Sequence, residues 1–290
     1  MRIVLMPLPS TMRFLNKLYL RLSWLSIDVV FGSMAGLAFF SELFQIGLEM
    51  EIYVLLGLAV WSIYTADHLV DARKKPMGNL SPRHQFHLKH KIGLIVFLIL
   101  SILFGLYLAL QTFGWGNEMM YSLILGILIF GSMALVRLAG EALAWLKELS
   151  IAVFYVLGIA WIPLLRGEEL DRNLYTWAFI FLYIFLALIN LLILSYLDRD
   201  QDRISGFPSS AQLILPMRLV EIIRKITFGF ILFCLFAFIL FPSFYRPFAC
   251  LLLLMGLVHY LAFFNPRLNP EQVRLRMEAA FLIPFLLLIF

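Results

Sequence analysis

The chain has 290 residues, of which 62% are hydrophobic and 14% are charged, and its mean hydropathy is +0.93. A soluble domain averages about 25% charged and 45–50% apolar residues, so this composition excludes a water-soluble globular protein. The net charge of +5 is carried by the segments between apolar stretches and does not indicate nucleic acid. We expect anionic membrane lipid and a phosphorylated substrate as partners, and no sequence pattern implies a protein partner.

The first 21 residues are predicted to form an interfacial helix that leads into the membrane. Arg13, Lys17 and Arg21 recur at helical spacing among apolar side chains, which is typical of a helix in the headgroup region. The segment lacks the short apolar core and small-residue cleavage site of a secretory signal peptide.

Nine apolar stretches follow. They cover residues 22–41, 50–66, 92–112, 119–138, 149–165, 174–197, 219–241, 247–264 and 271–290. A bilayer span takes about 20 apolar residues as a helix, and only helices or closed barrels satisfy their backbone groups in lipid. Because the runs are long, we predict an all-α integral membrane protein of about nine transmembrane helices in one polytopic domain, 1–290.

The ninth stretch departs most from a uniform apolar run, because Arg274, Arg276 and Glu278 lie near its start. Asn269 followed by Pro270 is nevertheless a typical helix start, and arginine side chains can extend toward the membrane surface. We therefore expect a helix here as well.

The Lys and Arg residues are unevenly divided between the two sets of connecting segments. Of the 23, only Arg166, Arg172 and Arg246 follow odd-numbered stretches. Because positively charged loops stay in the cytoplasm, we predict a multi-pass cell-membrane protein with a cytoplasmic N-terminus and an external C-terminus. Segments 72–91 and 198–218 are then cytoplasmic loops, and they are the candidate active-site loops.

Two aspartate clusters lie at the ends of the second and sixth stretches, on this cytoplasmic side. The first, WSIYTADHLVDARKK, contains Asp67 and Asp71, and the second, SYLDRDQDRISGFPSS, contains Asp198, Asp200 and Asp202. Residues four apart share one face of a helix, so each cluster stacks two carboxylates. The helix dipole disfavours negative charge at a C-terminus, so these aspartates indicate a bound cation rather than ordinary solvated helix ends.

Magnesium is the expected cofactor of these five carboxylates. It prefers one or two carboxylates, several waters and substrate phosphate oxygens to an all-protein cage. Two such clusters can hold a diphosphate through bridging ions and neutralise the charge on a leaving group. Candidates for the remaining phosphate oxygens are Arg73, Lys74, Lys147 and Arg199, although such cations also serve as membrane anchors.

In the second cluster the chain resembles the UbiA superfamily of intramembrane prenyltransferases. Many members carry DRDDD, then a glycine and a serine, after the sixth span. This chain has DRDQD from Asp198 to Asp202, followed by Gly206 and Ser209.

The first cluster is similar to the family motif NDxxDxxxD, which follows the second span. Asp67 and Asp71 match this motif, whereas Ile63 and Tyr64 stand where the family has asparagine and its first aspartate. The basic segment around Arg137 and Lys147 also resembles a family feature.

The resemblance extends over the whole chain in topology. It implies a ring of helices around a lipid-open cavity, with cytoplasmic metal sites at Asp67, Asp71, Asp198, Asp200 and Asp202. It also implies transfer of a prenyl group from a prenyl diphosphate to an aromatic or otherwise lipophilic acceptor.

Alternative functions remain open. A terpene cyclase on the same scaffold would ionise the diphosphate but quench the cation internally, and the loss of the family asparagine at Ile63 is compatible with it. A transporter or ion-binding protein would need ionisable residues deep in several spans, and apart from Asp28 they are almost lacking. Alcohol phosphotransfer would need a continuous aspartate motif with an Asp-Gly pair, which this chain does not have.

Several other polar residues are candidates for a functional role. Asp28 and Asn190 lie inside predicted spans, and Asp28 is either an interface residue or part of a cavity lining. His84, His87 and His90 fall in a basic segment expected to be solvated, with no cysteine or carboxylate to complete a zinc site.

Overall fold

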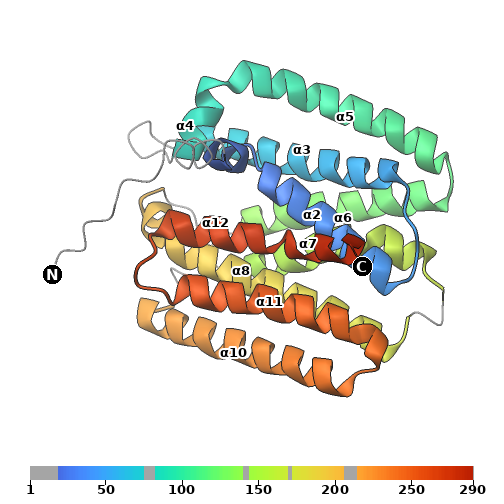
Figure 1. The fold of residues 1–290 in the computed structure, drawn as a ribbon. Helices are drawn as coiled ribbons and strands as arrows, with labels where there is room; N and C mark the ends of the chain where they lie inside the picture. Colours follow the sequence, from blue (N-terminus) through green and yellow to red (C-terminus); the bar gives the residue numbers. More distant parts are fainter. Residues whose placement is uncertain (1–18, 75–81, 140–143, 169–171, 206–213, 290) are drawn as a thin grey trace, which may run out of the picture.

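The computed structural model describes residues 19–74, 82–139, 144–168, 172–205 and 214–289. This part of the chain is helical and contains no strand, which confirms the all-α prediction. The helices are α2 (Ile27–Leu43), α3 (Met50–Lys74), α4 (Pro82–Lys89), α5 (Lys91–Phe113), α6 (Asn117–Ala139), α7 (Ala144–Arg166), α8 (Leu174–Ser205), α10 (Pro216–Leu240), α11 (Arg246–Phe263) and α12 (Pro270–Ala280), with the 3-10 helices η4 (Ser243–Tyr245) and η5 (Ile283–Ile289). The long helices run side by side in one bundle (Figure 1).

Six helices in the described residues are long and apolar enough to cross a membrane. They are Met50–Ala72, Lys91–Phe113, Leu146–Arg166, Leu174–Asp200, Pro216–Leu240 and Ser243–Phe263. The protein is therefore a multi-pass membrane protein by the length and composition of its helices. The other three predicted spans fall on shorter elements, namely α2 with 17 residues, the apolar segment Asn117–Ser132 of α6, and α12 with 11 residues, four of them charged.

The ninth stretch begins as its sequence predicts but does not continue as one long helix. Asn269 caps α12 by accepting a hydrogen bond from the Gln272 backbone N–H, and the Gln272 side chain accepts one from the Asn269 backbone N–H. After Ala280 the chain turns and tightens into η5, which contains Pro284. Proline has no N–H to donate and its ring clashes with the preceding turn, which disfavours an α-helix here.

The core lies among α2, α7, α8, α10, α11 and α12, where aromatic side chains pack edge to face. Phe39 contacts Phe40, Tyr183 and Phe248, with ring centroids 5.2–5.4 Å apart. Helix α5 lies at the edge of the bundle, and Leu94 is its one buried residue. Most of its other apolar side chains are exposed, as expected of a helix that faces lipid.

Close approach of α10 and α11 depends on Gly256. A Cβ atom at this position would lie 2.6 Å from Cε1 of Phe230. Small residues at such crossings let membrane helices pack by van der Waals contact, which is the main attraction between helices in lipid.

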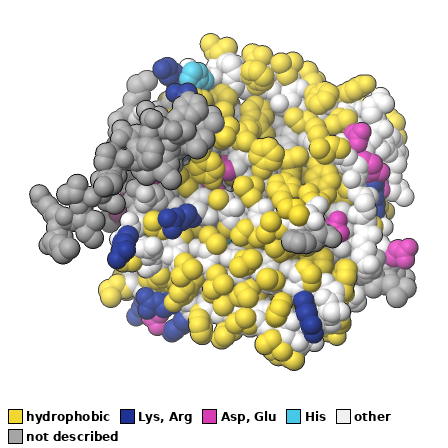
Figure 2. Space-filling model, viewed as in Figure 1, with side chains coloured by type: hydrophobic (Ala, Val, Ile, Leu, Met, Phe, Trp, Pro, Cys, Tyr) yellow, Lys and Arg dark blue, Asp and Glu magenta, His cyan; other side chains and the backbone are white. Residues whose placement is uncertain are grey.

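Charged side chains gather at the two ends of the bundle, and an apolar surface separates them. In Figure 2 most Lys and Arg side chains lie toward the left of the view and most Asp and Glu side chains toward the right. The left end carries α4 and the start of α12. It is also the end that carries both aspartate clusters.

Candidate functional site

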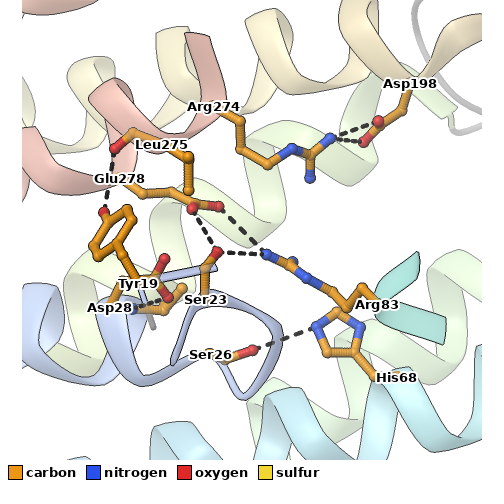
Figure 3. A network of polar contacts seen from close by, with 11 residues as sticks. Tyr19, Ser23, Ser26, Asp28, His68, Arg83, Asp198, Arg274, Leu275 and Glu278 are labelled. Atoms are coloured by element: carbon orange, nitrogen blue, oxygen red, sulfur yellow. Dashed lines mark hydrogen bonds and ion pairs between the residues drawn. The ribbon is translucent and has the colours of Figure 1, made fainter. Parts of the chain in front are cut away.

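Several elements bring polar side chains together at the end that carries α4. They are the segment 19–26, the C-terminal ends of α3 and α8, helix α4, and the first turns of α12. Residues 19–24 are helical, whereas residues 1–18 of the predicted interfacial helix lie outside the described residues. Hydrogen bonds and ion pairs join these elements into the network drawn in Figure 3.

The first aspartate cluster lies on the last turns of α3. The helix continues to Lys74, so Asp67 and Asp71 are one turn apart on one face, as their spacing predicts. Both side chains are half-buried, and Asp67 lies near Tyr64. The side chains of Arg73 and Lys74 lie outside the described part of the structure, so their role with a diphosphate stays a prediction.

The segments expected to be loops are helical at their starts. Segment 72–91 contains the end of α3 and all of α4, and residues 75–81 lie outside the described residues. Segment 198–218 begins within α8, which runs to Ser205, and residues 206–213 are likewise outside the description. Gly206 and Ser209, which carry part of the family resemblance, fall in this second gap.

The second aspartate cluster is held in place by α12. Nη2 of Arg274 donates to both carboxylate oxygens of Asp198, at 2.5 and 2.6 Å. The Asp198 side chain is still 37% exposed, so a ligand can reach it. Asp200 is exposed and Arg199 is half-buried, whereas the side chain of Asp202 lies outside the described residues.

Arg274 has neighbours in both aspartate-bearing helix ends, those of α8 and α3. Besides binding Asp198, it is among the charged neighbours of His68, which follows Asp67 on α3. Helix α3 packs mainly against α2, α4 and α5, and α8 packs mainly against α7, α10 and α11. The two clusters are therefore related through α12 and its arginine rather than through a large α3–α8 interface.

Helix α7 contributes Lys147 and Glu148 near the second cluster. Lys147 is half-buried, and Glu148 is buried and accepts a hydrogen bond from Oγ of Ser195 at 3.2 Å. Ser195 lies one turn before Asp198 on α8. The sequence did not single out Glu148, although an ionisable residue at the start of an apolar stretch is a candidate for a functional site.

A second polar group joins segment 19–26, α4 and α12. Nη2 of Arg83 donates to Oγ of Ser23 at 3.1 Å, and Ser23 donates to Oε2 of Glu278 at 3.2 Å. Arg83 and Glu278 also form an ion pair at 3.8 Å, with side chains 16% and 9% exposed. Oη of Tyr19 donates to the Leu275 carbonyl at 3.3 Å. Burial, with Asp28 and Glu278 nearby, raises the pKa of Tyr19 to about 12, so the phenol stays protonated.

The structure places Asp28 in this same group. It is 5% exposed, so its side chain lies among protein groups and not on the solvated surface. Glu278, which the sequence marks only as an interruption of the ninth stretch, is 8% exposed and lies beside it. An ionisable residue in an apolar stretch is the signal that would have found Glu278.

The histidines of α4 are less solvated than expected. His87 is 1% exposed and its ring lies 5.1 Å from that of His68, while His84 is half-buried and His90 is exposed. The expectation of a solvated histidine segment is thus wrong for His87, because α4 folds back onto α3. Nδ1 of His87 donates to the Arg83 carbonyl at 2.8 Å, and burial lowers the pKa of the ring, so the neutral form is favoured.

Asn190, the other polar residue noted inside a span, pairs with a residue that the sequence did not single out. Its Oδ1 lies 3.3 Å from Nε2 of His259, which is fully buried on α11. Nδ1 of the same ring donates to the Met255 carbonyl at 2.8 Å. Since Nδ1 carries the proton in that bond, Nε2 of the neutral ring is an acceptor, and the Asn190 amide must present its NH2 group or the ring must be charged.

The donor atoms present fit magnesium in their chemistry. Asp67, Asp71, Asp198 and Asp200 offer hard carboxylate oxygens, which Mg²⁺ prefers, at helix ends where water has access. Within the described residues no group of three or more His, Cys, Asp or Glu side chains lies close enough together to hold a metal. Water and phosphate oxygens would therefore have to supply most of the ligands, as they commonly do for Mg²⁺.

Fold and site together define a multi-pass, all-helical membrane protein with a network of carboxylates and arginines at one end of its bundle. The comparisons add no relative to this description, since no protein-family model, curated protein or solved structure matches the chain.

Proposed function

We propose that the protein is a magnesium-dependent intramembrane prenyltransferase, which transfers a prenyl group from a prenyl diphosphate to a lipophilic acceptor. The observation that carries the proposal is the placement of both aspartate clusters at one end of the bundle, with Arg274 between Asp198 and the end of α3. Five carboxylates and several cations at a membrane face suit a substrate with a charged diphosphate and an apolar tail. We place this end in the cytoplasm, because it carries most of the Lys and Arg residues.

In this proposal Asp67 and Asp71 hold one side of the diphosphate site, and Asp198, Asp200 and Asp202 hold the other. Bound magnesium would neutralise the charge that develops on the departing diphosphate. Arg73, Lys74, Lys147 and Arg199 are positioned along the chain to bind its free oxygens, and the half-exposed Asp198–Arg274 pair can open to receive it.

The prenyl chain would enter between the helices, in the central cavity that the family resemblance implies. Tyr64 has Asp67 and the buried Glu278 among its charged neighbours, and Tyr155 of α7 is close to Tyr64. Both side chains are only half-buried. An aromatic face next to the diphosphate site stabilises an allylic cation through its quadrupole and keeps water from it.

Tyr64 also supports a second candidate, cyclisation of the prenyl chain. It replaces a polar residue of the family motif with an aromatic ring. Such a ring stabilises the cation and shields it from an external acceptor, so that the cation reacts within the prenyl chain instead. Both candidates share the ionisation step and differ only in the organic product.

The test is diphosphate release by the detergent-purified protein, supplied with prenyl diphosphates of several chain lengths, with magnesium or with a chelator. Asp67→Asn and Asp198→Asn are compared with Glu51→Gln, which alters an exposed carboxylate at the opposite end of α3. Metal-dependent release that is lost in both aspartate variants and kept in Glu51→Gln supports the proposal, and product analysis then separates transfer from cyclisation.

An acceptor requirement would prevent release without disproving the site. The same proteins are therefore tested for magnesium-dependent binding of a non-hydrolysable prenyl diphosphate analogue. If the wild type shows neither release nor magnesium-dependent binding, the proposed function is wrong.

A further inference from the structure

Two buried carboxyl groups meet inside the bundle, and neither belongs to the aspartate clusters. Asp28 of α2 and Glu278 of α12 are 5% and 8% exposed. Glu278 is within hydrogen-bonding reach of the Asp28 carboxyl group. Figure 3 shows Glu278 joined to Ser23 and Arg83, and Asp28 next to Tyr19.

The donors around these two groups leave one buried oxygen with neither a hydrogen bond nor an ion pair. Oδ1 of Asp28 accepts from the Val29 N–H at 2.9 Å, and Oε2 of Glu278 accepts from Ser23. Oδ2 of Asp28 is buried, and no donor from the described residues reaches it. Ionised carboxylates only accept hydrogen bonds, so a contact between two of them is a hydrogen bond only if one carries a proton.

The surrounding charges also require one of the two carboxyl groups to carry a proton. Among the described residues, the charged and titratable groups that face the pair are Arg83 from α4, Arg274 from α12, Tyr19 from the N-terminal segment and Tyr64 from α3, while His68 of α3 lies near Arg83. Arg274 donates to Asp198 of α8, and His259 of the adjacent α11 faces Asn190 and Phe281 instead. Tyr19 and Tyr64 are neutral as phenols.

Arg83 alone cannot balance two ionised carboxyl groups. With both ionised, the group of three would carry a net charge of −1 in a site with little water, which is strongly unfavourable. One proton on the pair makes the group neutral and supplies the missing donor.

We propose that Asp28 and Glu278 share one proton and together form a proton-binding site between α2 and α12. This inference does not depend on the proposed reaction. Glu278 lies one turn after Arg274 on the same face of α12, so loss of the shared proton gives Arg274 a second carboxylate to bind besides Asp198. The protonation state of the pair is thereby linked to the second aspartate cluster.

The first test is thermal unfolding of the purified protein in detergent across a pH series. Unfolded carboxyl groups lose their protons near pH 4, whereas the folded pair keeps one to higher pH. Over that interval the folded protein binds one more proton, so the unfolding equilibrium constant rises up to about tenfold per pH unit and the midpoint temperature falls. We expect this slope to be lost in Asp28→Asn and in Glu278→Gln, each of which keeps a donor in the contact.

The matched control is Glu221→Gln, because Glu221 is an exposed carboxylate on α10 that pairs only with Lys225 among the residues described here. This variant should retain the wild-type pH slope. A wild-type slope that either pair variant leaves unchanged would overturn the proposal.

The second test is infrared spectroscopy of the wild type, which needs no variant to fold. The shared proton predicts a carboxylic acid carbonyl band that shifts in heavy water. The band should disappear when the pH is raised through the interval in which the midpoint temperature falls. Two outcomes contradict the proposal. One is the absence of this band at every pH. The other is a midpoint temperature of unfolding that rises with sodium, potassium or magnesium at constant pH. The latter would identify a metal cation, rather than a proton, between the carboxyl groups.

Discussion

The two ends of the bundle hold their charged groups in different ways. At the end opposite α4, Nε and Nη2 of Arg166 donate to the two carboxylate oxygens of Glu118, at 2.9 and 3.0 Å. Nη1 of the same guanidinium donates to Glu49 at 2.7 Å. One arginine thus joins the end of α7 to the start of α6 and to the residue before α3.

At the α4 end the pairing is incomplete. Glu278 pairs with Arg83 and also has the buried carboxyl group of Asp28 beside it, and Asp198 keeps 37% of its side-chain surface although it binds Arg274. The first arrangement fastens helices together. The second has a surplus of carboxylate that a proton, a metal ion or a cationic group can neutralise, and this difference separates a structural contact from a candidate site.

The largest effect is expected from Arg83→Leu. The substitution leaves the buried Glu278, which lies beside the buried Asp28, without its cation, and breaking a buried pair in this way typically costs about 3 kcal/mol or more. Unfolding in detergent should show a clear loss of stability that grows as the pH is raised. The double variant Arg83→Leu/Glu278→Gln should recover most of it, and failure to recover would mean that Arg83 acts through other contacts.

A smaller loss is expected from Arg166→Leu. Its partners Glu49 and Glu118 are 57% and 31% exposed, so solvent screens the lost ion pairs and the cost is about 1 kcal/mol. The control is Lys225→Leu, whose side chain is 73% exposed and should change stability by less than about 0.5 kcal/mol. Equal losses of stability in the two variants would show that the ion pairs of Arg166 contribute no more than an exposed surface pair.

Arg274→Gln is expected to strengthen magnesium binding. Removal of the guanidinium frees both Asp198 oxygens, and a pair worth about 1 kcal/mol corresponds to about a fivefold lower half-saturating magnesium concentration. A magnesium titration of diphosphate-analogue binding measures it. Arg276→Gln, which alters an exposed arginine on the same helix, should change nothing. Weaker magnesium binding in Arg274→Gln would indicate that the arginine positions Asp198 instead.

The smallest effect concerns the acid side of the stability profile. A backbone hydrogen bond and the Arg166 guanidinium lower the pKa of Glu49 below its ordinary value of 4.5. The stabilisation is therefore complete above pH 4.5 and is lost as the pH falls through the lowered pKa. Melting curves of wild type and Glu49→Gln should converge in acid, whereas the Asp28–Glu278 pair destabilises the protein toward alkaline pH. Curves that stay parallel would show that Glu49 does not contribute to the pH dependence of stability.

Local features of the structure follow the sequence closely. The helix start at Asn269 and Pro270 is confirmed, and the spacing of Asp67 and Asp71 places both on one face of α3 because that helix runs to Lys74. Both depend on neighbours within one turn, which the sequence lists directly. The ninth stretch is not one long helix, since Pro284 follows α12.

Contacts between distant segments were not predictable in this way. His87 was expected in a solvated segment but is buried because α4 packs onto α3, and Glu278 became a partner of Asp28 only because α12 lies against α2. Arg274 binds Asp198 across 76 positions of the chain. No periodicity within either segment encodes such a pairing.

The sequence by itself determined that this protein is an all-helical, multi-pass membrane protein with carboxylates at two helix ends, because hydropathy and helical spacing are properties of consecutive residues. The tertiary structure decided which of those charges meet. Pairing in a bundle depends on which helices become neighbours and how they are rotated, and packing of side chains from remote segments sets both. That is why the arginine held by Asp198 and the carboxyl pair of Asp28 and Glu278 appear only in the folded protein.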